Sequence, residues 1–524
     1  MKRILSIGLI IIISLAMFSC KAESNEKHDP VVDPISDNFR VFYEIFTSSF
    51  SDSNNDGIGD LKGIISKLDY LNDGDILSGN SLGVQGIWLT PIFSSPSYHK
   101  YDVSDYLRID SKIGTMEDLK ELIDKCHERN VLVILDLPIN HTSTRHTWFV
   151  RFEEAHKKGD TTSEYYDYYT WCVKGEKPAG RTFNTISGTN DMYEANFTGD
   201  MPELNFDNEK VKSACVDIAK YYLDMGVDGF RFDAAKYIYY GEADKNVAFW
   251  NWYMGELKKI KSDVYCVGEV WSSDYEIIPY HSSLNCFNFQ MGLNEGQIAT
   301  FANAGNGNIY TGYIANYIKK IHDENKNSMM IPFIANHDTD RAAGFLTVAS
   351  KRAYMAANLL LLSYGSPFIY YGEEIGMKGT RGGANSDANR RLAMLWGDGN
   401  TVRDPNEATY DSSKQTNGTV KSQLEDNESL LKYYMKVISF RNKYPFIARG
   451  DYEQVRMPGD LGCFKITYEG KTYYLIHNTE SDAVEFDLSL IADGLSLIDS
   501  IGVESSKLNG TKLSIGAQSS VIIG

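Results

Sequence analysis

Cysteine is scarce in this chain, which has seven cysteines in 524 residues. Six of them are scattered, with no CxxC pair and none of the ligand spacings of a zinc finger. The sequence therefore indicates neither a cysteine-based metal site nor a disulfide framework. We expect most of these cysteines to be free, buried thiols; disulfides are possible but not indicated. The seventh, Cys20, follows an apolar N-terminal run.

Positive charge and long apolar runs are also in short supply. Lysine and arginine number 52 against 70 acidic residues, a formal net charge of −18, which argues against nucleic acid as a partner. The apolar run at residues 4–18 is shorter than the ~20 residues of a membrane-spanning helix, which argues against a transporter-associated ectodomain.

Aromatic residues are plentiful, with 34 tyrosines and seven tryptophans. They suit stacking on sugar faces, although core packing accounts for most of them.

The first twenty residues predict export. Lys2 and Arg3 precede the apolar run, an arrangement typical of a signal peptide. The run ends at Ser19 and Cys20, which resembles a bacterial lipoprotein signal and implies a lipid on Cys20. Cleavage by ordinary signal peptidase is the alternative. Residues 21–38 are polar and lack periodicity, which predicts a flexible tether. We therefore expect a monomeric membrane lipoprotein that faces the cell surface or the periplasm.

Eight apolar, strand-like runs alternate with amphipathic, helix-like stretches. The runs cover residues 40–46, 84–90, 131–136, 227–233, 264–269, 285–290, 331–336 and 367–371. The helix-like stretches include residues 117–128, 209–225 and 350–363. Strands that alternate with helices form a parallel sheet, so eight such units predict the α/β class and a (β/α)8 TIM barrel.

Two regions depart from this alternation. The runs that end at 136 and begin at 227 are about sixty residues further apart than a ~30-residue crossover requires. We therefore expect residues 142–205 to form an inserted domain after the third strand. From residue 451, short alternating segments with turn signals predict a C-terminal antiparallel β-sandwich over residues 451–524. Residues 39–141 and 206–450 are left for the barrel.

The stretch GFRFDAAK, residues 229–236, carries the strongest chemical signal. Side chains alternate along a strand, so Arg231 and Asp233 project to the same side. A nearby guanidinium lowers an aspartate pKa by roughly 1–3 units, and an ionised carboxylate at a strand end is what a nucleophile needs. Taken alone, the pair is equally compatible with an ion pair that holds the strand end. Glu269 and Asp338 also follow predicted strands, and such ends converge on the C-terminal face of a barrel.

Four short motifs occur in a characteristic order: DLPINH at 136–141, GFRFDAAK at 229–236, GEVW at 268–271 and ANHD at 335–338. They resemble the signature regions of the α-amylase family, glycoside hydrolase family 13, and the resemblance runs from about residue 39 to the C-terminus. It implies that Asp233 is the nucleophile, Glu269 the acid/base and Asp338 a carboxylate that grips the sugar. Retaining glycosidases use two carboxyls about 5–5.5 Å apart. We expect desolvation to raise the pKa of Glu269.

The same resemblance implies which residues hold the sugar. His141 and His337 match the family's hydrogen-bond donors, and Tyr101 matches the tyrosine that stacks under the sugar. Lys100 stands where the family usually has glycine. The expected substrate-binding residues are Tyr101, His141, Arg231, His337, His99 and Lys236.

The segment MPELN, residues 201–205, resembles the region that separates subfamilies, and is nearest the group between oligo-1,6-glucosidases and neopullulanases. Ala234 also looks amylase-like, whereas Tyr237 replaces a histidine common in amylases. We expect an endo-acting α-amylase that cleaves α-1,4 bonds of starch and maltooligosaccharides. The alternatives are an α-glucosidase, an oligo-1,6-glucosidase or a neopullulanase-like transglycosylase. A non-catalytic glycan-binding lipoprotein is the alternative of a different class.

Residues 52–60, DSNNDGIGD, predict a calcium site. Oxygen donors at positions 1, 3, 5 and 9, a glycine at 6 and a backbone carbonyl at 7 reproduce most of a calcium loop, although no glutamate follows at position 12. The expected ligands of this structural Ca²⁺ are Asp52, Asn54, Asp56, Ile58 and Asp60. The alternative is an Asx turn in which Asp60 caps the following helix. A second calcium at Asn140 is left open by the resemblance.

Overall fold

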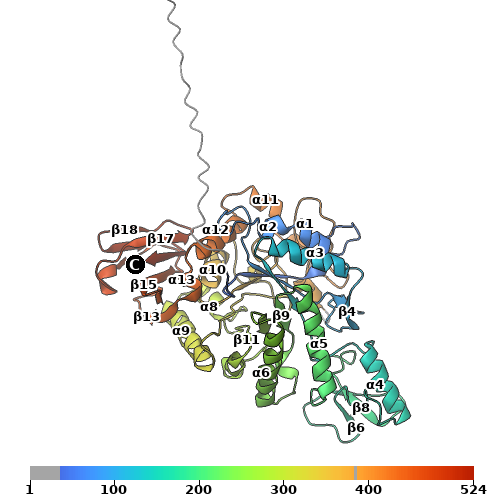
Figure 1. Ribbon diagram of the computed structural model, residues 1–524. Helices are drawn as coiled ribbons and strands as arrows, with labels where there is room; N and C mark the ends of the chain where they lie inside the picture. The colour runs from blue at the N-terminus through green and yellow to red at the C-terminus, as the bar shows by residue number, and fades with distance from the viewer. Residues whose placement is uncertain (1–35, 383–385) are drawn as a thin grey trace, which may run out of the picture.

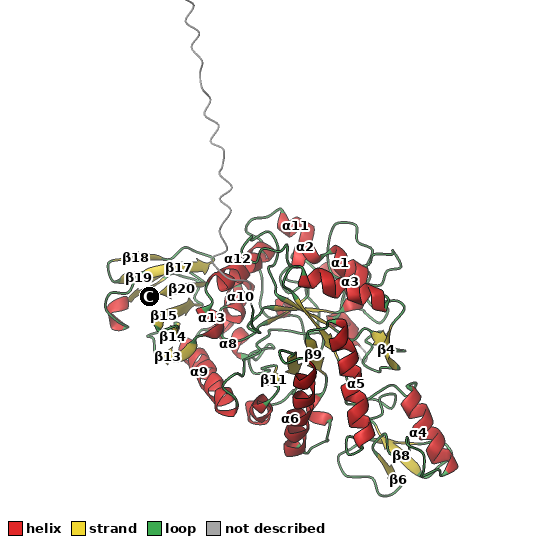
Figure 2. Cartoon of the chain, in the orientation of Figure 1, coloured by secondary structure: helices red, strands yellow, loops and turns green. Residues whose placement is uncertain are grey.

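The computed structural model describes residues 36–382 and 386–524 (Figure 1). The predicted signal peptide, Cys20 and most of the predicted tether lie outside the described residues. Figure 2 shows helices arranged around a central group of strands, with a strand-rich unit at one end of the molecule. The centre is the barrel, and it positions the candidate site.

The barrel sheet consists of parallel strands in the order β11-β10-β9-β5-β2-β1-β12. Its strands are β1 (Phe42–Ile45), β2 (Gly86–Leu89), β5 (Leu132–Asp136), β9 (Gly229–Phe232), β10 (Tyr265–Gly268), β11 (Asn285–Cys286) and β12 (Phe368–Tyr370). Every residue of β1, β2, β9, β10 and β12 is buried, as expected for strands covered by helices on one side and by the barrel interior on the other.

The expected strand at residues 331–336 is absent as a strand, and that prediction is wrong. Ile331 makes only an isolated parallel bridge to Phe287. Pro332 has no N–H to donate, so a regular ladder cannot continue through it. The segment nevertheless joins the two edges of the sheet, because the Ile331 carbonyl accepts from Asn288 N at 2.9 Å and the Pro332 carbonyl accepts from Phe368 N at 2.9 Å. These bonds close the (β/α)8 barrel.

The described chain enters the barrel where the strands begin. Asp37 forms an ion pair with Arg449 of α13 (Phe446–Arg449) at 2.6 Å. Arg40 then donates to the carbonyls of Gln85, at 3.3 Å, and Asn130, at 2.7 Å. Both carbonyls lie just ahead of strands, β2 and β5, so residues 37–40 mark the face of the barrel opposite to the strands' C-terminal ends.

Helix α5 (Glu209–Met225) shows how the sequence specifies the outer layer. The Asn208 side chain accepts from Lys210 N at the start, and Gly226, with a φ of 114°, ends the helix in the left-handed conformation. Its buried residues recur every three or four positions and form one apolar face: Val211, Cys215, Ile218, Ala219, Tyr222 and Leu223. The predicted stretch 209–225 therefore has the right bounds.

The other helices that cover the barrel follow the same alternation with strands. The predicted stretches 117–128 and 350–363 correspond to α3 (Met116–His127) and α10 (Arg352–Leu361). Further helices are α1 (Leu61–Ser66), α2 (Leu68–Leu71), α6 (Ala243–Ile260), α7 (Asp274–Ile277), α8 (Gln297–Ala304), α9 (Gly307–Glu324), α11 (Val420–Leu424) and α12 (Leu430–Lys443).

Between β5 and α5 the chain leaves the barrel. It forms helix α4 (Thr147–Lys158) and a three-stranded antiparallel sheet of order β6-β8-β7, which Figure 1 shows projecting at the lower right. The strands are β6 (Trp171–Val173), β7 (Phe183–Thr185) and β8 (Asp191–Glu194). A short hairpin, β3 (Phe93–Ser94) with β4 (Asp105–Ile109), follows β2. The fold thus has the inserted unit after the third strand, while its exact boundaries, 142–205, stay a prediction.

The C-terminal unit consists of two antiparallel sheets. One has the order β13-β14-β15-β20-β17 and the other β16-β19-β18. Their strands are β13 (Asp451–Val455), β14 (Gly462–Tyr468), β15 (Lys471–Asn478), β16 (Val484–Asp487), β17 (Leu497–Gly502), β18 (Lys507–Asn509), β19 (Lys512–Ile515) and β20 (Ser519–Ile523). Apolar side chains of both sheets, among them Ile476, Val521 and Leu513, share one core. This packing confirms the predicted sandwich.

Of the predicted free thiols, five are buried and Cys172 is half-buried, and within the described residues all six are unpaired. Across residues 36–382 and 386–524, no helix has the length and apolar character needed to cross a bilayer.

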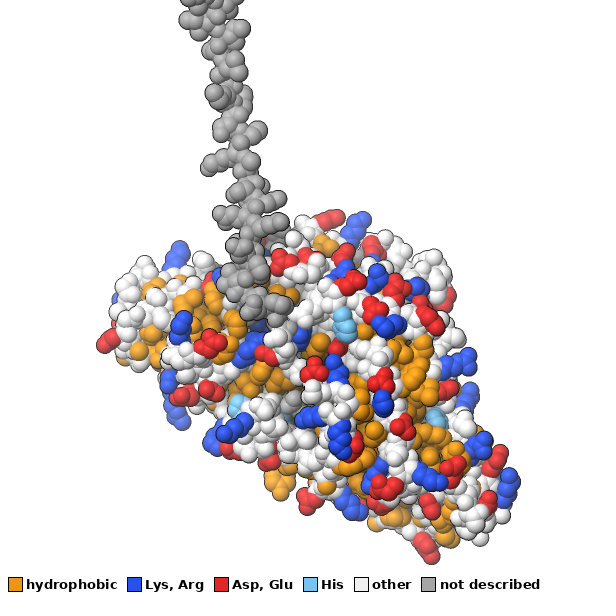
Figure 3. All heavy atoms as spheres, in the orientation of Figure 1, with side chains coloured by type: hydrophobic (Ala, Val, Ile, Leu, Met, Phe, Trp, Pro, Cys, Tyr) orange, Lys and Arg blue, Asp and Glu red, His pale blue; other side chains and the backbone are white. Residues whose placement is uncertain are grey.

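On the face shown in Figure 3, acidic and basic side chains are interspersed and no single basic surface stands out.

Candidate active site

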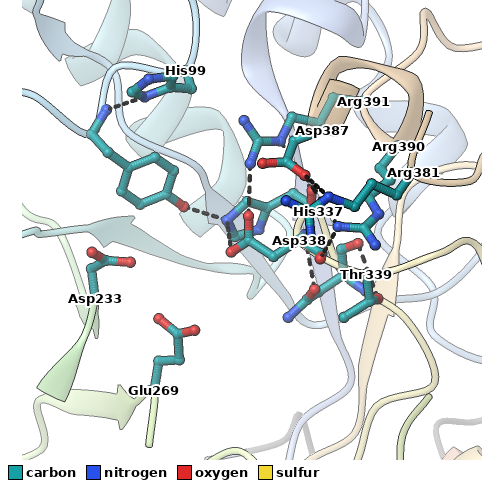
Figure 4. A network of polar contacts seen from close by, with 12 residues as sticks. His99, Asp233, Glu269, His337, Asp338, Thr339, Arg381, Asp387, Arg390 and Arg391 are labelled. Carbon is teal, nitrogen blue, oxygen red and sulfur yellow. Dashed lines mark hydrogen bonds and ion pairs between the residues drawn. The ribbon is translucent and has the colours of Figure 1, made fainter. Parts of the chain in front are cut away.

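Two acidic side chains and one arginine meet at the ends of neighbouring barrel strands. Asp233 directly follows β9 and Glu269 directly follows β10, and the two carboxyls lie close to each other in Figure 4. Arg231, within β9 and only 1% exposed, donates from Nη1 to Asp233 Oδ1 and from Nη2 to Glu269 Oε2, both at 2.7 Å. One guanidinium therefore holds both carboxyls, and the predicted placement of Arg231 and Asp233 on one side of the strand is confirmed.

Asp136, the last residue of β5, is a third acid at this arginine. It accepts from Arg231 Nη1 at 2.9 Å and from the Tyr101 hydroxyl at 2.9 Å. Burial raises the pKa of Asp136 to about 6. Asp136 is not among the predicted site residues. Its position at the end of a predicted strand, like that of Asp233, is the sequence feature that could have identified it. Separating a buried charge from its partners costs about 3–5 kcal/mol, so Arg231 stabilises this end of the barrel as well as orienting its acids.

Burial sets the protonation of the two adjacent carboxyls. It raises the pKa of Glu269 to about 7, with Arg231 opposing the shift and Asp233 adding to it. Burial also raises the pKa of Asp233 above its ordinary value, again opposed by Arg231. The prediction of a lowered pKa for Asp233 is therefore wrong: Arg231 does lower it, but the loss of solvent at an enclosed strand end outweighs this one cation. The predicted rise for Glu269 is confirmed.

Asp338 faces these carboxyls from the irregular segment that follows residue 334 (Figure 4). Its Oδ1 is 2.7 Å from Arg391 Nη2, and its Oδ2 is 2.9 Å from His337 Nε2. Burial alone would raise its pKa, but His337, Arg391 and Arg231 outweigh burial and hold the pKa of Asp338 well below its ordinary value. Asp338 is therefore anionic. Arg391 is not among the predicted residues, since it lies in a segment with neither strand nor helix periodicity.

His337 is surrounded by hydrogen-bond acceptors. Its Nδ1 is 2.6 Å from Glu44 Oε1, and its Nε2 is 2.6 Å from the Tyr101 hydroxyl in addition to facing Asp338. The Tyr101 ring stacks on the imidazole with centroids 5.5 Å apart. Burial lowers the pKa of His337, but Asp338 and Glu44 outweigh burial and raise it to about 10. Tyr101 and His337, both predicted to bind the sugar, thus contact each other. Glu44 also belongs to this cluster, although none of the four motifs contains it.

The two other predicted histidines are neutral at pH 7. Burial lowers the pKa of His141 to about 4 and that of His99 to about 4. His141 Nε2 is buried without a hydrogen-bond partner, so it is available to a bound sugar. His99 Nδ1 accepts from Tyr101 N at 3.1 Å. Lys100, with a φ of 63°, adopts the left-handed conformation that glycine takes most readily, and its Nζ pairs with Asp110 at 2.7 Å.

Lys236 lies toward the rim, where its Nζ donates to the Trp271 carbonyl at 2.8 Å. Trp271 is 43% exposed and stacks on Phe289 with ring centroids 5.0 Å apart. Phe197, from the inserted unit, packs on Tyr237 with centroids 5.1 Å apart. Partly exposed aromatic rings of this kind offer apolar area to sugar faces.

The MPELN segment, residues 201–205, lies directly against the DLPINH motif. A bridge joins Glu203 to His141, and Leu204 N donates to the Asn140 carbonyl at 3.0 Å. The inserted unit is thereby fastened to the end of β5, beside the candidate site.

The predicted calcium loop, residues 52–60, lies before α1. Asp60 Oδ1 accepts from Gly63 N at 2.7 Å, so Asp60 does cap the helix. Asp52 Oδ2 accepts from Gly57 N at 2.8 Å and from the Thr401 hydroxyl at 2.6 Å. Within the described parts of the chain, no three His, Cys, Asp or Glu side chains gather as metal ligands do. The oxygen-only donor set still has the chemistry that Ca²⁺ prefers, and the calcium site stays a prediction.

Comparison with known proteins agrees with this geometry. The family described as "Alpha amylase, catalytic domain" matches residues 44–450. Alpha-amylase 3 of Dictyoglomus thermophilum is 34% identical over 90% of this chain and 90% of its own length. Oligo-1,6-glucosidase of Bacillus cereus is 30% identical over 83% of this chain and 89% of its own length. The solved structure of Eubacterium rectale Amy13B superimposes with a TM-score of 0.86 at 35% identity, covering 94% of this chain and 96% of that one.

The family match spans more than half of the chain and contains Asp233, Glu269 and Asp338, which the barrel brings to one face. The structural match extends beyond it into the C-terminal sheets. The chain therefore belongs to the α-amylase family, glycoside hydrolase family 13, and is an α-amylase-type glycosidase.

Proposed function

We propose that this enzyme is a retaining, endo-acting α-amylase that hydrolyses α-1,4 bonds of starch and maltooligosaccharides by double displacement. The observation that carries the proposal is the shared contact of Arg231 with Asp233 and Glu269, each at 2.7 Å. Two carboxyls bound to one guanidinium are adjacent, as a retaining mechanism requires. The pKa of about 7 keeps Glu269 largely protonated in mildly acidic solution, so it can act as an acid.

In the first step, Asp233 attacks the anomeric carbon while Glu269 gives its proton to the glycosidic oxygen. The bond to the leaving chain breaks, and an ester bond to Asp233 forms. In the second step, Glu269, now a carboxylate, takes a proton from water, whose oxygen attacks the anomeric carbon and releases Asp233. Asp338, held anionic by His337 and Arg391, accepts hydrogen bonds from the sugar and stabilises the positive charge that develops.

The preference for α-1,4 bonds is supported by Ala234, by the MPELN segment and by the relatives. Alpha-amylase 3 of Dictyoglomus thermophilum is 34% identical, against 30% for the oligo-1,6-glucosidase of Bacillus cereus. An α-glucosidase, oligo-1,6-glucosidase or neopullulanase-like transglycosylase is the second candidate, since two relatives are named oligo-1,6-glucosidase and two others 4-alpha-glucanotransferase. Both candidates share the same three carboxylates, so the products must decide between them.

The decisive experiment is a time course of products from the chain without residues 1–20, given maltoheptaose, soluble starch, pullulan or isomaltose. Early maltose to maltotetraose with the α-anomer retained supports the endo-acting α-amylase. Glucose as the sole early product, or cleavage of isomaltose, moves the protein to the second candidate. Absence of any cleavage would support a glycan-binding protein instead.

The pH profile should follow Glu269. Its pKa of about 7 means that the acid form, which the first step needs, is present below that pH and is lost as the pH rises through it. We therefore expect kcat/KM on maltoheptaose to fall about tenfold per pH unit above that point, since this ratio reports groups of the free enzyme. A profile that stays level well into the alkaline range contradicts the role of Glu269.

We also propose that residues 52–60 bind a structural Ca²⁺ through Asp52, Asn54, Asp56, Asp60 and the Ile58 carbonyl. The loop lies outside the carboxylate cluster, so the metal would stabilise the chain and take no part in bond cleavage. Chelation should lower Tm by several degrees, and added Ca²⁺ should restore it, since a ligand bound only to the folded state stabilises it. Asp56→Ala should abolish the response. If Tm is unchanged and elemental analysis finds no metal, the proposed calcium site is refuted.

We propose that the protein is exported and anchored through a lipid on Cys20. The signal-like residues 1–20 support this, and they lie outside the described residues. Mass spectrometry of the mature N-terminus should find acyl chains on Cys20, and Cys20→Ala should release the protein from the membrane fraction. An unmodified N-terminus at another residue would indicate ordinary signal peptidase. The monomeric state also stays a prediction.

A further inference from the structure

Glu44 is a buried acid at the candidate site that the family motifs do not contain. It lies in β1 and is 1% exposed, and its Oε1 is 2.6 Å from His337 Nδ1. A carboxyl group in the barrel interior is costly unless it has a partner. The imidazole of His337, itself completely buried, is that partner.

The hydrogen bonds determine where the protons of His337 lie. The Tyr101 hydroxyl has one proton and donates it to Asp136 Oδ2 at 2.9 Å, so the Tyr101 oxygen accepts from His337 Nε2 at 2.6 Å. Asp338 Oδ2, another acceptor, is 2.9 Å from the same nitrogen. Nε2 must therefore carry a proton.

A second proton lies between His337 Nδ1 and Glu44 Oε1, because two unprotonated atoms would repel at 2.6 Å. We assign this proton to Nδ1, as an imidazolium beside a carboxylate, because two acids, Asp338 and Glu44, contact the ring, and the pair titrates as one unit. Burial raises the pKa of Glu44, and the acidic neighbours raise that of His337 to about 10. Both effects keep the shared proton in place at neutral pH.

Other charged groups surround this pair from every side. Arg391 Nε donates to the His337 carbonyl at 3.0 Å, and the Trp88 ring lies 5.6 Å from the imidazole. The charged and titratable groups that face His337 directly or through Tyr101 are Glu44, Tyr101, Asp136, Arg231, Asp338 and Arg391. Glu44 is the acid that contacts Nδ1, so its removal changes that nitrogen first.

We propose that Glu44 is a positioning residue of the reaction: by holding the second ring proton at His337 Nδ1, it keeps the imidazole a cation, whose Nε2–H binds Asp338 and Tyr101 and orients them toward the sugar. Without the Glu44 carboxyl, Nδ1 can lose its proton, the imidazole becomes neutral, and Asp338 loses a cationic partner. The inference rests on the proposed hydrolysis of α-1,4-glucans at this site.

The test compares Glu44→Gln with Glu374→Gln in otherwise intact enzyme. Glu374 is a matched control, since it is fully buried and accepts from the Tyr43 hydroxyl at 2.7 Å. Tyr43 and Glu44 are neighbours in β1, so their side chains project to opposite faces and Glu374 lies on the face away from His337. Glu44→Gln should lower kcat on maltoheptaose about 10–100-fold, the size expected when a catalytic group is misplaced, with little change in KM. Glu374→Gln should leave kcat within about twofold and should affect Tm alone.

Ring ¹⁵N NMR of His337, assigned with a His337→Asn variant, provides the readout that a purely structural role would not move. Both ring nitrogens should carry protons up to about pH 9 in the wild type, and Glu44→Gln should lose the Nδ1 proton at least about one pH unit lower. Unchanged kcat and unchanged titration in folded Glu44→Gln overturn the proposal. If that variant does not fold, the wild type decides: a ring nitrogen without a proton at pH 7 overturns it, and two protonated nitrogens support it. A wild type that leaves maltoheptaose intact refutes the proposed function instead.

Discussion

Asp233→Ala should lower kcat on maltoheptaose by about 10⁴-fold or more, because the glycosyl ester cannot form without the attacking oxygen. The fold should survive, since Arg231 keeps Asp136 at 2.9 Å and Glu269 at 2.7 Å. The measurement is steady-state hydrolysis beside circular dichroism and Tm. Added azide should restore turnover by attacking the anomeric carbon from the vacated side, and the product should be a β-glycosyl azide.

Asp228→Ala is the matched control for this prediction. Asp228 precedes the same strand at its other end, where it accepts from His127 at 2.8 Å and from Val133 N at 2.8 Å. Its replacement should reduce Tm but retain kcat within a few-fold, as expected of a residue remote from the chemistry. Substantial hydrolysis by Asp233→Ala, or an α-glycosyl azide as the rescue product, would show that another residue attacks the sugar.

Glu269→Gln should lower kcat on maltoheptaose by about 10³-fold, within the usual contribution of general acid–base catalysis. The amide keeps the shape of the side chain but has no proton to give to the leaving oxygen. An α-maltosyl fluoride should escape most of this loss in the first step, because fluoride leaves without protonation. The glycosyl-enzyme should then accumulate, and mass spectrometry should detect it on Asp233.

Glu256→Gln serves as the control for Glu269→Gln, since Glu256 lies on α6 and pairs with Lys259 at 2.6 Å, outside the site. It should be indistinguishable from the wild type. Equal losses on the fluoride and on maltoheptaose would contradict an acid role for Glu269 and would indicate a general defect in binding or folding. Loss of the alkaline decline in the pH profile of Glu269→Gln would complete the assignment.

Much of the barrel could be predicted from the sequence because each strand is an apolar run that ends in a polar motif. Asp233 and Glu269 directly follow their strands, and the bounds of α5 were predicted without error. These features depend on local periodicity, which one segment carries by itself. The strand predicted at 331–336 fails for a local reason too, since Pro332 cannot continue the ladder that the apolar composition suggests.

The contacts that the sequence could not reveal join distant segments. Glu44 meets His337 across 293 residues, and Arg391 meets Asp338 across 53. No regular sequence spacing relates the two members of such a pair, so these contacts become visible only when the barrel is closed. The pKa of Asp233 has the same origin: its arginine lies two residues away and is visible in the sequence, whereas the burial that outweighs it comes from the whole enclosure.

The entry of the chain beside Arg449 bears on how large polymers reach the enzyme. Asp37 is fixed to α13 on the face where the strands begin, and the carboxylates lie on the opposite face. The N-terminal connection at Asp37 therefore joins the barrel on the face that lies away from Asp233 and Glu269. If the proposed function holds, a long glucan chain can approach Asp233 without crossing this connection, so a tether at the N-terminus leaves the approach of a bulky polymer unobstructed.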